Sequence, residues 1–438
     1  MSSYIPIKVN ALNEPRFDER ILYAPDSDVP VLFPSHTVDF DVDFAGQWLV
    51  CADLDGDGRA ELVTARNDHQ AITAMSAWRL DGTCLWTWGE PGAGSPVRTY
   101  DVPLQLYDID GDGQVEVVYG VHGKLVVAEG ASGRTLWEWP LPPGLEVADC
   151  ITFARLTSTE GPADILVKTR YTKVWAFDPE WRCLWSWEPA GNYKTCHHPT
   201  VFDVDGDGLD EIMAGYVLLG PDGGERWTYN TNAVDLSHGH LDCCWVAETG
   251  TSPEAFRLVV TACGADHVAL LDGTGRMLWE HAGHHFESAE TGRLRPESAW
   301  DVVVDIDHRP YGESPMWVIG ADGAQLGSYM TNYSRFHHLV DIDGDGFDEI
   351  LLAHARTLCD ASGRRRYQFA PDDDFAAAAA VDPLDGDTGP FAVTGDMTGD
   401  GRIDIVAHTE RRAHVYENQG HLTEPGMDVG TPVNFTLY

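Results

Sequence analysis

Short apolar runs alternate with glycine- and aspartate-rich turns along most of this chain. From about residue 46 one unit recurs: an apolar run, an acidic turn, a β-rich run such as residues 61–65, a third run, and an aromatic run after a glycine turn. Short runs bounded by turn residues predict β-strands, and their regular recurrence predicts a repeat protein. The pattern therefore predicts four short antiparallel strands in each repeat.

A glycine turn followed by an aromatic residue gives a second signal, independent of the acidic turns. Eight such turns, some of them without the glycine or without the aromatic residue, occur at a mean spacing of roughly 48 residues, a length typical of one propeller blade. The eight turns lie at residues 80–86, 131–137, 177–185, 221–227, 272–279, 321–326, 361–367 and 417–420. Because a flat side chain at a fixed place in every repeat fills the same gap, we expect the tryptophans among them to pack between blades.

Inner strands can be placed before each acidic turn and, in degenerate form, near residues 153–156, 245–247 and 302–307. The sequence thus predicts an all-β fold, a single eight-bladed β-propeller over residues 46–438, with seven blades as the alternative. Residues 1–45 carry no acidic turn and mix prolines with apolar residues. We interpret them as a lead-in segment that can contribute one strand.

The acidic turn has the form DxDGDG and is closed by a carboxylate at its ninth position. Oxygen side chains stand at positions 1, 3, 5 and 9, and the glycines let the chain turn tightly enough to aim them at one centre. Four nearly identical copies and a degenerate fifth favour calcium binding over acidic turns that hold no ion. The predicted ligands of these mainly structural Ca²⁺ ions are Asp53, Asp55, Asp57, Glu61, Asp108, Asp110, Asp112, Glu116, Asp203, Asp205, Asp207, Glu211, Asp341, Asp343, Asp345, Glu349, Asp396, Thr398, Asp400 and Asp404.

Charge, cysteine content and hydropathy limit the kinds of partner and the cellular compartment that the chain can have. The net charge is -41, and five calcium ions would leave about -31, which repels nucleic acid where no basic stripe is present. The nine cysteines follow no disulfide framework and fit free thiols in a reducing compartment. No stretch reaches the roughly 20 apolar residues of a membrane span, and the N-terminus has no signal-peptide pattern. We expect a monomer or small homo-oligomer without a membrane partner, cytoplasmic unless the chain is the mature form of a secreted protein.

Strand direction separates two faces of the predicted propeller. The strands of a blade run antiparallel outward from the axis, so the acidic and glycine turns share one face, while the loops from second to third strand and the crossovers between blades share the other. Thirteen of the 18 histidines map to that second face, together with tyrosines and cations. The predicted catalytic residues are His240, His285, His338, Tyr171 and Arg170. The predicted substrate-binding residues are Lys168, His197, His198, Tyr193, His284, His337, Arg335 and Arg98.

Two chemistries suit these residues. Histidine or tyrosine could act as base and acid on an acidic carbon proton, with a cation stabilising the enolate-like charge. Alternatively, a further divalent metal could bind at the histidine-rich face, with ligands drawn from His240, Asp242, His284 or His285, and His338.

Several segments carry a resemblance to a known family. The acidic loop 203–211 with Gly215 and the trailing aromatic turn resembles the propeller of rhamnogalacturonan-lyase-type polysaccharide lyases and their FG-GAP-repeat relatives. Further matching segments are 167–171, 175–178, 191–199, 240–242, 283–284, 398–402 and 433–438. The resemblance implies an eight-bladed propeller with structural calcium that cleaves an acidic, rhamnose-containing glycan by β-elimination next to a uronic acid. Extracellular members carry an Ala-His-Tyr motif where residues 96–103 lack histidine, so a histidine- and tyrosine-based mechanism is expected here.

The expected function is a lyase acting on an acidic oligosaccharide or polysaccharide that contains rhamnose and uronate. Arg170, Lys168 or a metal would neutralise the uronate carboxylate. One of His240, His285 or His338 would take the C5 proton, and Tyr171 or a second histidine would protonate the leaving oxygen. Two alternatives remain, a non-catalytic propeller that binds glycans or proteins and a metal-dependent glycoside hydrolase.

Overall fold

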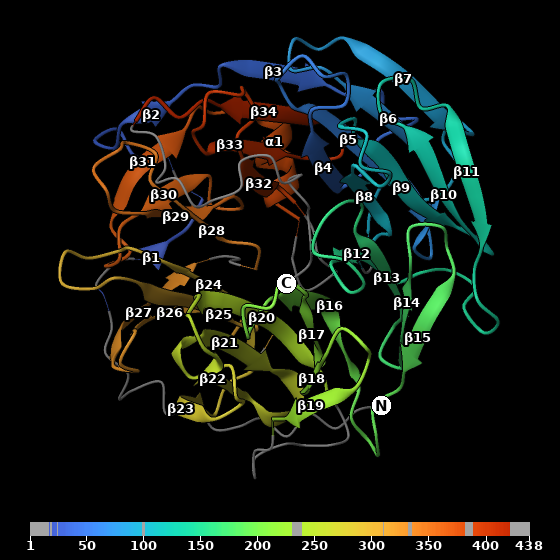
Figure 1. Cartoon of the computed structure of the whole chain (residues 1–438). Helices are drawn as coiled ribbons and strands as arrows, with labels where there is room; N and C mark the ends of the chain where they lie inside the picture. The colour runs from blue at the N-terminus through green and yellow to red at the C-terminus, as the bar shows by residue number, and fades with distance from the viewer. Residues whose placement is uncertain are drawn as a thin grey trace.

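The computed structural model describes residues 17, 20–23, 25–98, 101–229, 239–309, 311–331, 335–381 and 389–420. Across these residues the strands form eight sheets, which stand around a common axis as the blades of a propeller (Figure 1). The prediction of an all-β, eight-bladed propeller is confirmed, and the seven-blade alternative is wrong. No helix in the described part of the chain has the length and apolar character needed to cross a membrane.

The first four blades are each built from four consecutive antiparallel strands. Blade 1 contains β4 (Trp48–Ala52), β5 (Glu61–Asp68), β6 (Ala71–Trp78) and β7 (Cys84–Gly89). Blade 2 contains β8 (Leu104–Tyr107), β9 (Glu116–Val121), β10 (Lys124–Glu129) and β11 (Thr135–Pro140). Blade 3 contains β12 (Cys150–Ala154), β13 (Asp164–Thr169), β14 (Lys173–Phe177) and β15 (Cys183–Trp187). Blade 4 contains β16 (Thr195–Phe202), β17 (Glu211–Gly215), β18 (Val217–Leu219) and β19 (Glu225–Thr228).

The other four blades follow the same plan, with short helical insertions. Blade 5 contains β20 (Leu241–Glu248), β21 (Arg257–Ala262), β22 (His267–Leu271) and β23 (Met277–Ala282), with the 3-10 turns η1 (Pro253–Ala255) and η2 (Cys263–Ala265) between strands. Blade 6 contains β24 (Phe286–Gly292), β25 (Asp301–Ile306), β26 (Ser314–Gly320) and β27 (Gln325–Thr331). Blade 7 contains β28 (His338–Val340), β29 (Glu349–Leu352), β30 (Thr357–Cys359) and β31 (Arg365–Phe369). Helix α1 (Asp373–Ala379) then leads to β32 (Phe391–Gly395), β33 (Asp404–His408) and β34 (Arg412–Tyr416) of blade 8.

The N-terminal segment closes the ring. Strand β3 (His36–Asp39) pairs antiparallel with β34 and is the outermost strand of blade 8. The short strands β1 (Arg20–Ile21) and β2 (Val31–Leu32) add parallel fifth strands to blades 6 and 7. The lead-in segment thus supplies three strands rather than one within the described residues. The turn at 417–420 does not join two strands of blade 8, because the outermost strand comes from the other end of the chain.

One inner strand lies elsewhere than the sequence predicts. Predicted positions near 153–156 and 245–247 overlap the inner strands β12 and β20, but residues 302–307 overlap β25, the second strand of blade 6. The innermost strand is β24, which carries Glu287, Ser288 and Glu290 beside apolar residues. The buried, apolar run of β25 has the sequence pattern expected of an inner strand. The true inner strand, β24, carries polar side chains and therefore does not show that pattern.

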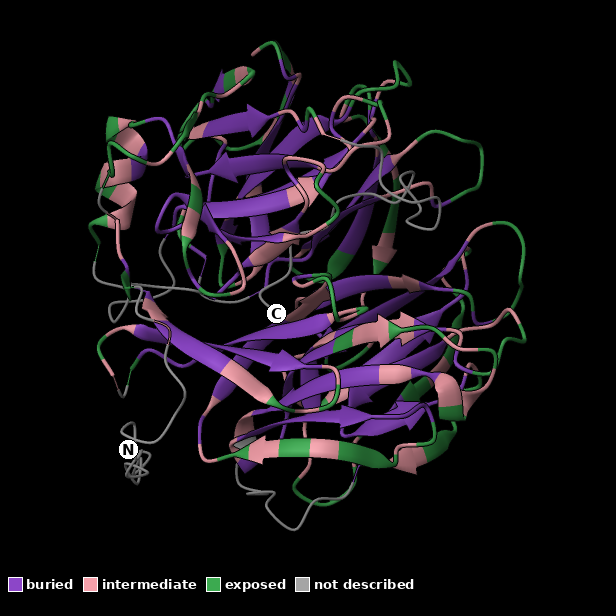
Figure 2. Ribbon diagram, turned by 90° about the vertical axis from the view of Figure 1, so that its left-hand side faces the viewer, coloured by how far each residue is buried: buried purple, intermediate pink, exposed green. Residues whose placement is uncertain are grey.

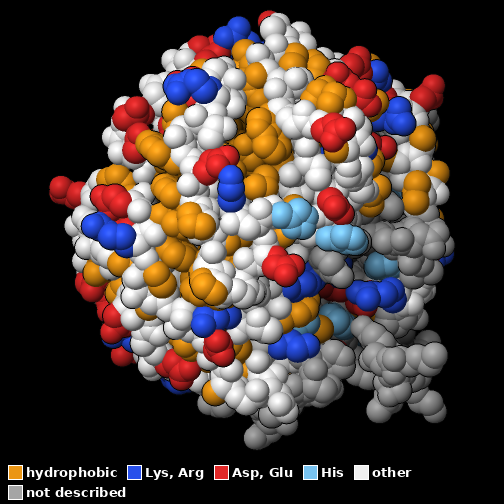
Figure 3. All heavy atoms as spheres, turned by 90° about the vertical axis from the view of Figure 1, so that its right-hand side faces the viewer, with side chains coloured by type: hydrophobic (Ala, Val, Ile, Leu, Met, Phe, Trp, Pro, Cys, Tyr) orange, Lys and Arg blue, Asp and Glu red, His pale blue; other side chains and the backbone are white. Residues whose placement is uncertain are grey.

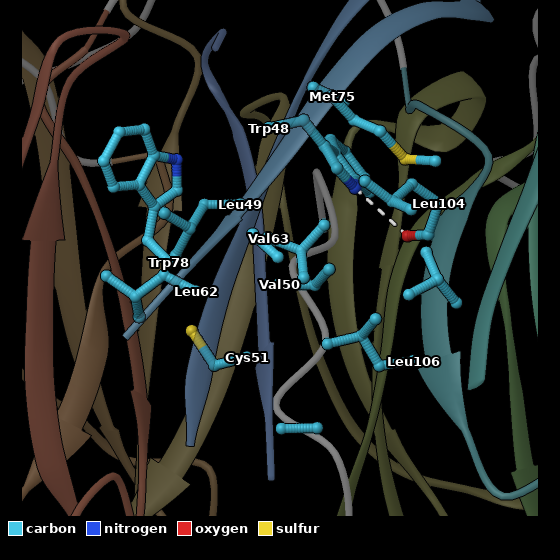
Figure 4. Packing of buried hydrophobic residues seen from close by; sticks show 14 of the residues in the cluster. Trp48, Leu49, Val50, Cys51, Leu62, Val63, Met75, Trp78, Leu104 and Leu106 are labelled. Atoms are coloured by element: carbon cyan, nitrogen blue, oxygen red, sulfur yellow. Dashed lines mark hydrogen bonds between the residues drawn. The ribbon is translucent and has the colours of Figure 1, made fainter. Parts of the chain in front are cut away.

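Tryptophans join neighbouring blades, as predicted. Trp48 Nε1 of blade 1 donates a hydrogen bond to the Leu104 carbonyl of blade 2 at 3.2 Å, within the apolar cluster of Figure 4. Trp86 Nε1 likewise donates to the Gly130 carbonyl at 2.7 Å. Its ring packs on Gly133, where a Cβ atom would lie 2.7 Å from the indole and where φ is +67°. Glycine turn and tryptophan are therefore two halves of one contact between blades.

The burial pattern follows from this packing. In Figure 2 strands inside the sheets are mostly buried, while outer strands such as β11 and β23 contain only intermediate and exposed residues. Strand β4 is buried at every residue, whereas β7 buries mainly Trp86. Flat sheets packed face to face around an axis bury both faces of their inner strands, so polar groups collect at the strand ends, where the sites lie.

Candidate functional site

The acidic loops join first and second strands on one face. In the loop after β16, Asp203 accepts backbone N–H groups of Gly206 and Gly208 at 2.7 and 2.8 Å, and Glu211 accepts from Val204 at 3.1 Å. These bonds fold the loop so that its carboxylates converge. Ligand atoms within 4.8 Å of one another come from Asp53, Asp55 and Asp57, from Asp108, Asp110 and Glu116, and from Asp203, Asp205 and Glu211.

Electrostatics in these loops call for a cation. Burial, together with the neighbouring aspartates, raises the pKa of Glu61, Glu116 and Glu211 to about 7. Among the described residues, Asp55 Oδ1 is buried without a hydrogen-bond partner. The converging carboxylates repel one another, and a bound cation would relieve this repulsion. Carboxylate oxygens are the ligands that calcium prefers.

The opposite face holds a cluster of imidazoles around one carboxylate. His240 and Asp242 stand two residues apart at the start of β20, so alternation along the strand points both to one side. Asp242 Oδ1 lies 3.2 Å from His240 Nε2 and 3.4 Å from His197 Nε2, and its Oδ2 lies 3.5 Å from His285 Nε2. The four residues lie in or immediately before the inner strands β16, β20 and β24 of blades 4, 5 and 6, and we call them the axial cluster.

Tyr171 completes one side of the axial cluster. It lies in the turn between β13 and β14 with φ +69°, a left-handed conformation that aims its side chain from blade 3 toward blades 4 and 5. Its hydroxyl lies 3.2 Å from His197 Nε2 and accepts a hydrogen bond from Arg170 Nη2 at 3.0 Å. Its ring lies 4.6 Å from that of His240, centroid to centroid, and Lys194 Nζ stands 5.2 Å from the ring.

Charged side chains of both signs surround His285. Glu287, two residues further along the chain, has its Oε1 3.7 Å from His285 Nε2 and pairs with Arg335. Arg309 Nη2 approaches Glu287 Oε1 at 3.5 Å, and Arg309 Nε donates to Asp307 Oδ1 at 2.9 Å. Figure 3 shows histidine side chains gathered with Lys, Arg, Asp and Glu side chains in a hollow of the surface.

The environment sets the charge of each group. Burial alone would lower the pKa of His240, but the charge of Asp242 and the hydrogen bond to it raise that pKa to about 10. The pKa of His285 is likewise held well above its usual range, against burial, by Glu287 and Asp242. Burial lowers the pKa of His197 to about 3, so this imidazole stays neutral. The pKa of Asp242 lies well below its usual range, so this carboxylate is ionised. It is surrounded by two protonated imidazoles, His240 and His285, and one neutral imidazole, His197.

Of the five catalytic and eight substrate-binding residues predicted from the sequence, six lie together in or beside the axial cluster. They are His197, His240, His285, Tyr171, Arg170 and Arg335.

Lys168 sits beneath the site rather than in it. Its side chain is fully buried and forms an ion pair with Asp149, so it cannot contact a substrate, contrary to the prediction. Arg98 is also buried, with its guanidinium over the rings of Phe336 and Phe391 at 4.5 and 4.2 Å.

The remaining predicted residues are held in other contacts. His338 Nδ1 lies 2.8 Å from Glu290 Oε1, and its Nε2 lies 3.0 Å from the Ala392 carbonyl. His337 packs against Ser288, His284 Nδ1 lies 2.9 Å from the Tyr311 hydroxyl, His198 Nδ1 lies 3.2 Å from the Pro199 carbonyl, and the Tyr193 ring packs against Tyr216. Two further residues of the predicted face, Tyr100 and His238, and the segment 433–438 lie outside the described residues.

Four residues at the site were absent from the predicted catalytic and binding sets. They are Asp242, Glu287, Arg309 and Cys263, whose sulfur lies within 4.8 Å of an Asp242 oxygen and a His285 nitrogen. Two of them had a sequence signal: His240-Leu-Asp242 and His285-Phe-Glu287 repeat one pattern, histidine and carboxylate two residues apart, at the start of consecutive inner strands. Cys263 and Arg309 had none, because they come from loops whose direction only packing determines.

Fold and site together define a β-propeller with converging acidic loops on one face and a polar axial cluster on the other. The family model for the C-terminal domain of rhamnogalacturonan lyase family 11 matches residues 165–415, more than half of the chain. The chain belongs to this family.

Individual relatives agree with this assignment. The chain is 24% identical over 328 residues to the rhamnogalacturonan exolyase YesX of Bacillus subtilis (strain 168), covering 58% of this chain and 51% of the relative. It is 24% identical over 429 residues to the rhamnogalacturonan endolyase YesW of the same organism, covering 82% and 64%. The chain therefore spans about half to just under two thirds of these curated relatives. The structure of a Bacillus licheniformis rhamnogalacturonan lyase PL11 superposes with a TM-score of 0.61 at 19% identity, over 90% of this chain and 76% of that one, which shows the shared fold.

Proposed function

We propose that this chain is a lyase that cleaves a rhamnogalacturonan-like glycan by β-elimination next to a uronate. Membership of the family and the likeness to YesX and YesW support the reaction class. The observation that carries the proposal is the Tyr171 hydroxyl, held between the Arg170 guanidinium and His197 beside the protonated His240. A phenol surrounded by cations is suited to moving a proton at a carbon next to a carboxylate.

The cations would bind the substrate carboxylate and acidify the neighbouring carbon. Elimination needs the C5 proton of the uronate, which becomes easier to remove when a positive charge stabilises the enolate-like carboxylate. Arg170 and Arg309 are partly exposed, with 23% and 51% of their side chains accessible, and flank the cluster from blades 3 and 6. We assign carboxylate binding to these two arginines, and a supporting role to the buried Arg335.

Tyr171 is the residue we assign to proton transfer. Burial raises its pKa to about 12, so the phenol is protonated at neutral pH and can give its proton to the leaving oxygen. In the same concerted step the Tyr171 oxygen would receive the C5 proton: the electron pair of the C5–H bond forms the C4–C5 double bond, the bond from C4 to the leaving oxygen breaks, and the phenol ends the reaction unchanged. Arg170 would stabilise the negative charge that develops on the phenol oxygen. This assignment differs from the expectation of a histidine base, because His240 and His285 are held protonated and both ring nitrogens of His338 have partners.

We further propose that the acidic loops bind Ca²⁺ and that these ions are structural. The converging carboxylates and the orphaned Asp55 oxygen fit such an ion, and the loops lie at the strand ends opposite the axial cluster. Bound ions would fix the turns between first and second strands and would relieve the repulsion among the carboxylates.

The test of the lyase proposal is the product. Purified protein with calcium should release oligosaccharides with an unsaturated uronate end from rhamnogalacturonan, followed by ultraviolet absorbance, and Tyr171→Phe should slow this release by about 10²- to 10⁴-fold. Ulvan and gum arabic oligomers serve as comparison substrates. Saturated products would instead indicate a hydrolase. No unsaturated product from any of the three glycans would overturn the proposal in favour of a binding propeller.

A further inference from the structure

A tryptophan stands in one turn where six other blades use glycine. Within the described chain, the turns between third and fourth strands that hold a glycine with φ between +67° and +86° are those of Gly82, Gly133, Gly223, Gly275, Gly323 and Gly363. In the same turn of blade 3 the residue is Trp181, with φ +63°. Its N–H donates to the Asp178 carbonyl at 2.8 Å, as that of Gly223 does to the Gly220 carbonyl at 2.9 Å. A bulky side chain is strained in this conformation and persists only where its surroundings compensate for the strain.

This tryptophan changes the contact between blades 2 and 3. At the interface of blades 1 and 2, Trp86 packs on Gly133 and is 8% exposed. Trp137 is the corresponding residue of β11, but blade 3 presents Trp181 in place of the glycine. Trp137 therefore does not pack in the same way, and it is 38% exposed.

Instead of one buried contact, this interface carries a row of stacked rings. Trp181 stacks on Phe177 with ring centroids 3.9 Å apart and planes 11° apart, and on Trp139 at 5.1 Å and 6°. Trp139 and Trp137 lie two residues apart on β11, with centroids 6.3 Å apart and planes 1° apart. Trp181 Nε1 donates to the Pro140 carbonyl at 2.9 Å, which fixes its ring. We call the three nearly parallel indoles, Trp137, Trp139 and Trp181, the aromatic row.

The aromatic row lies on the outer rim of the propeller and meets solvent. Strands β11 and β15 form the rim on the right of Figure 1, and Figure 3, which views the molecule from that side, shows exposed hydrophobic side chains across it. Trp137 is exposed, and the other two indoles are partly exposed. Three indoles of about 250 Å² each, none more than 38% exposed, offer at most about 300 Å², whereas a stable protein interface buries about 800 Å² on each partner. The row is thus too small for a protein partner and suits a narrow ligand.

The chemistry of the row fits a pyranose. The C–H groups of a sugar ring form an apolar face that packs flat on an indole while the hydroxyls stay in water, and exposed apolar groups of this kind mark binding sites. Charged side chains on the same strands and turns are paired: Lys124 Nζ lies 2.6 Å from Glu138 Oε2, and Arg182 Nε lies 2.6 Å from Asp178 Oδ2. In a chain of net charge -41, this pairing keeps the repulsion of an acidic glycan low at the row.

We propose that the aromatic row is a second glycan-binding site, which holds a pyranose segment of a polysaccharide away from the axial cluster. Resting on the proposed lyase function, the polysaccharide is the substrate. Tyr171 precedes β14 and Trp181 follows it, so the two lie at opposite ends of a strand of five residues, about 17 Å long. A polymer can contact both places, while a disaccharide bound at Tyr171 reaches only the axial cluster.

The test measures glycan binding apart from cleavage. All proteins carry Tyr171→Phe, which slows cleavage, and migrate through native gels that contain increasing concentrations of rhamnogalacturonan. We expect the glycan to retard the parent, and Trp137→Ala to weaken this binding by about 3- to 10-fold, the effect of one lost stacking contact. Trp137→Phe keeps an aromatic face and should retain most of the binding. The matched control, Leu278→Ala, changes a residue that is 37% exposed on the outermost strand β23 of blade 5 and should bind as the parent does.

Two results would overturn the second site. One is equal retardation of the parent, Trp137→Ala and Trp139→Ala at every glycan concentration, with circular dichroism showing that both variants are folded. The other is a change of oligomeric state in Trp137→Ala on size-exclusion chromatography with glycan binding unchanged, which would assign the row to contact between copies of the chain. Unsaturated products from the wild type test the lyase proposal separately, because the protein can bind the polymer at the row without cleaving it and can cleave it without using the row.

Discussion

Replacing Lys168 with methionine should destabilise the fold and leave substrate binding intact. Lys168 lies on β13 with a fully buried side chain, and its ammonium group is paired with Asp149, which is also buried. Burial alone would raise the pKa of Asp149, but Lys168 and Arg170 hold it below its usual range, so the carboxylate is ionised in the fold. Methionine is one atom shorter than lysine and removes both the charge and the hydrogen bond to Asp149.

The magnitude follows from what remains around Asp149. Breaking a buried ion pair by removing one partner costs about 3–5 kcal/mol. We expect about 3 kcal/mol, because Arg170 Nη1 still lies 3.6 Å from Asp149 and Gln70 still donates to it. At about 2.1 cal/mol/K per residue, the unfolding entropy of 438 residues is roughly 0.9 kcal/mol/K, so the melting temperature should fall by about 3 °C.

The assay compares two neighbouring cations. Thermal unfolding by circular dichroism and steady-state kinetics are measured for Lys168→Met, Arg170→Met and the double variant Lys168→Met/Asp149→Asn. Lys168→Met should lower the melting temperature with little change in KM. Arg170→Met should reduce activity with a smaller loss of stability, and the double variant should recover part of the loss because no unpaired charge stays buried. An unchanged melting temperature with a raised KM for Lys168→Met would refute the reasoning and restore Lys168 as a substrate ligand.

Three further predictions address the site and the fold. Tyr171→Phe should lower kcat by about 10²- to 10⁴-fold with KM nearly unchanged, as loss of a proton-transferring group does, and a matching rise in KM alone would contradict this. Removing calcium with a chelator should lower the melting temperature, and Asp203→Ala should reduce the calcium-dependent gain, which calorimetry with and without Ca²⁺ measures. The pKa of His338 is raised, against burial, by Glu290, so this pair stabilises the fold fully below the unfolded pKa of about 6.5 and the gain is lost as pH rises through the folded pKa. The melting-temperature difference between wild type and Glu290→Gln should therefore shrink from pH 6 toward alkaline pH, and a difference that grows would show that the pair is not ionic.

The repeat signals made the fold predictable from sequence. An acidic turn and a glycine–aromatic turn recur independently, and each repeats because every blade needs the same two local structures. The structure shows the reason for the second: Trp86 packs on Gly133 of the next blade, so a change in either would disturb both blades. Where a repeat signal was missing, as in blade 6, an apolar second strand was mistaken for the inner strand.

The site was only partly predictable. Strand direction placed the histidines on the correct face, and the pattern of His240 and Asp242 could be read from alternation along one strand. Alternation cannot say which strands share a contact across blades. His285 and His338 both lie where the chain enters an inner strand, yet His285 faces Asp242 while His338 is held by Glu290.

The sequence by itself determined the number of blades, the convergence of carboxylates in the acidic loops 53–61, 108–116 and 203–211, and the face that carries the imidazoles, because these depend on contacts among residues close in the chain. The tertiary structure decided that β3 closes the ring, that Lys168 is buried and that Cys263 and Arg309 lie beside the axial cluster. Those outcomes depend on how distant segments pack around one axis, and packing fixes the direction of a loop side chain in a way that its neighbours in sequence do not.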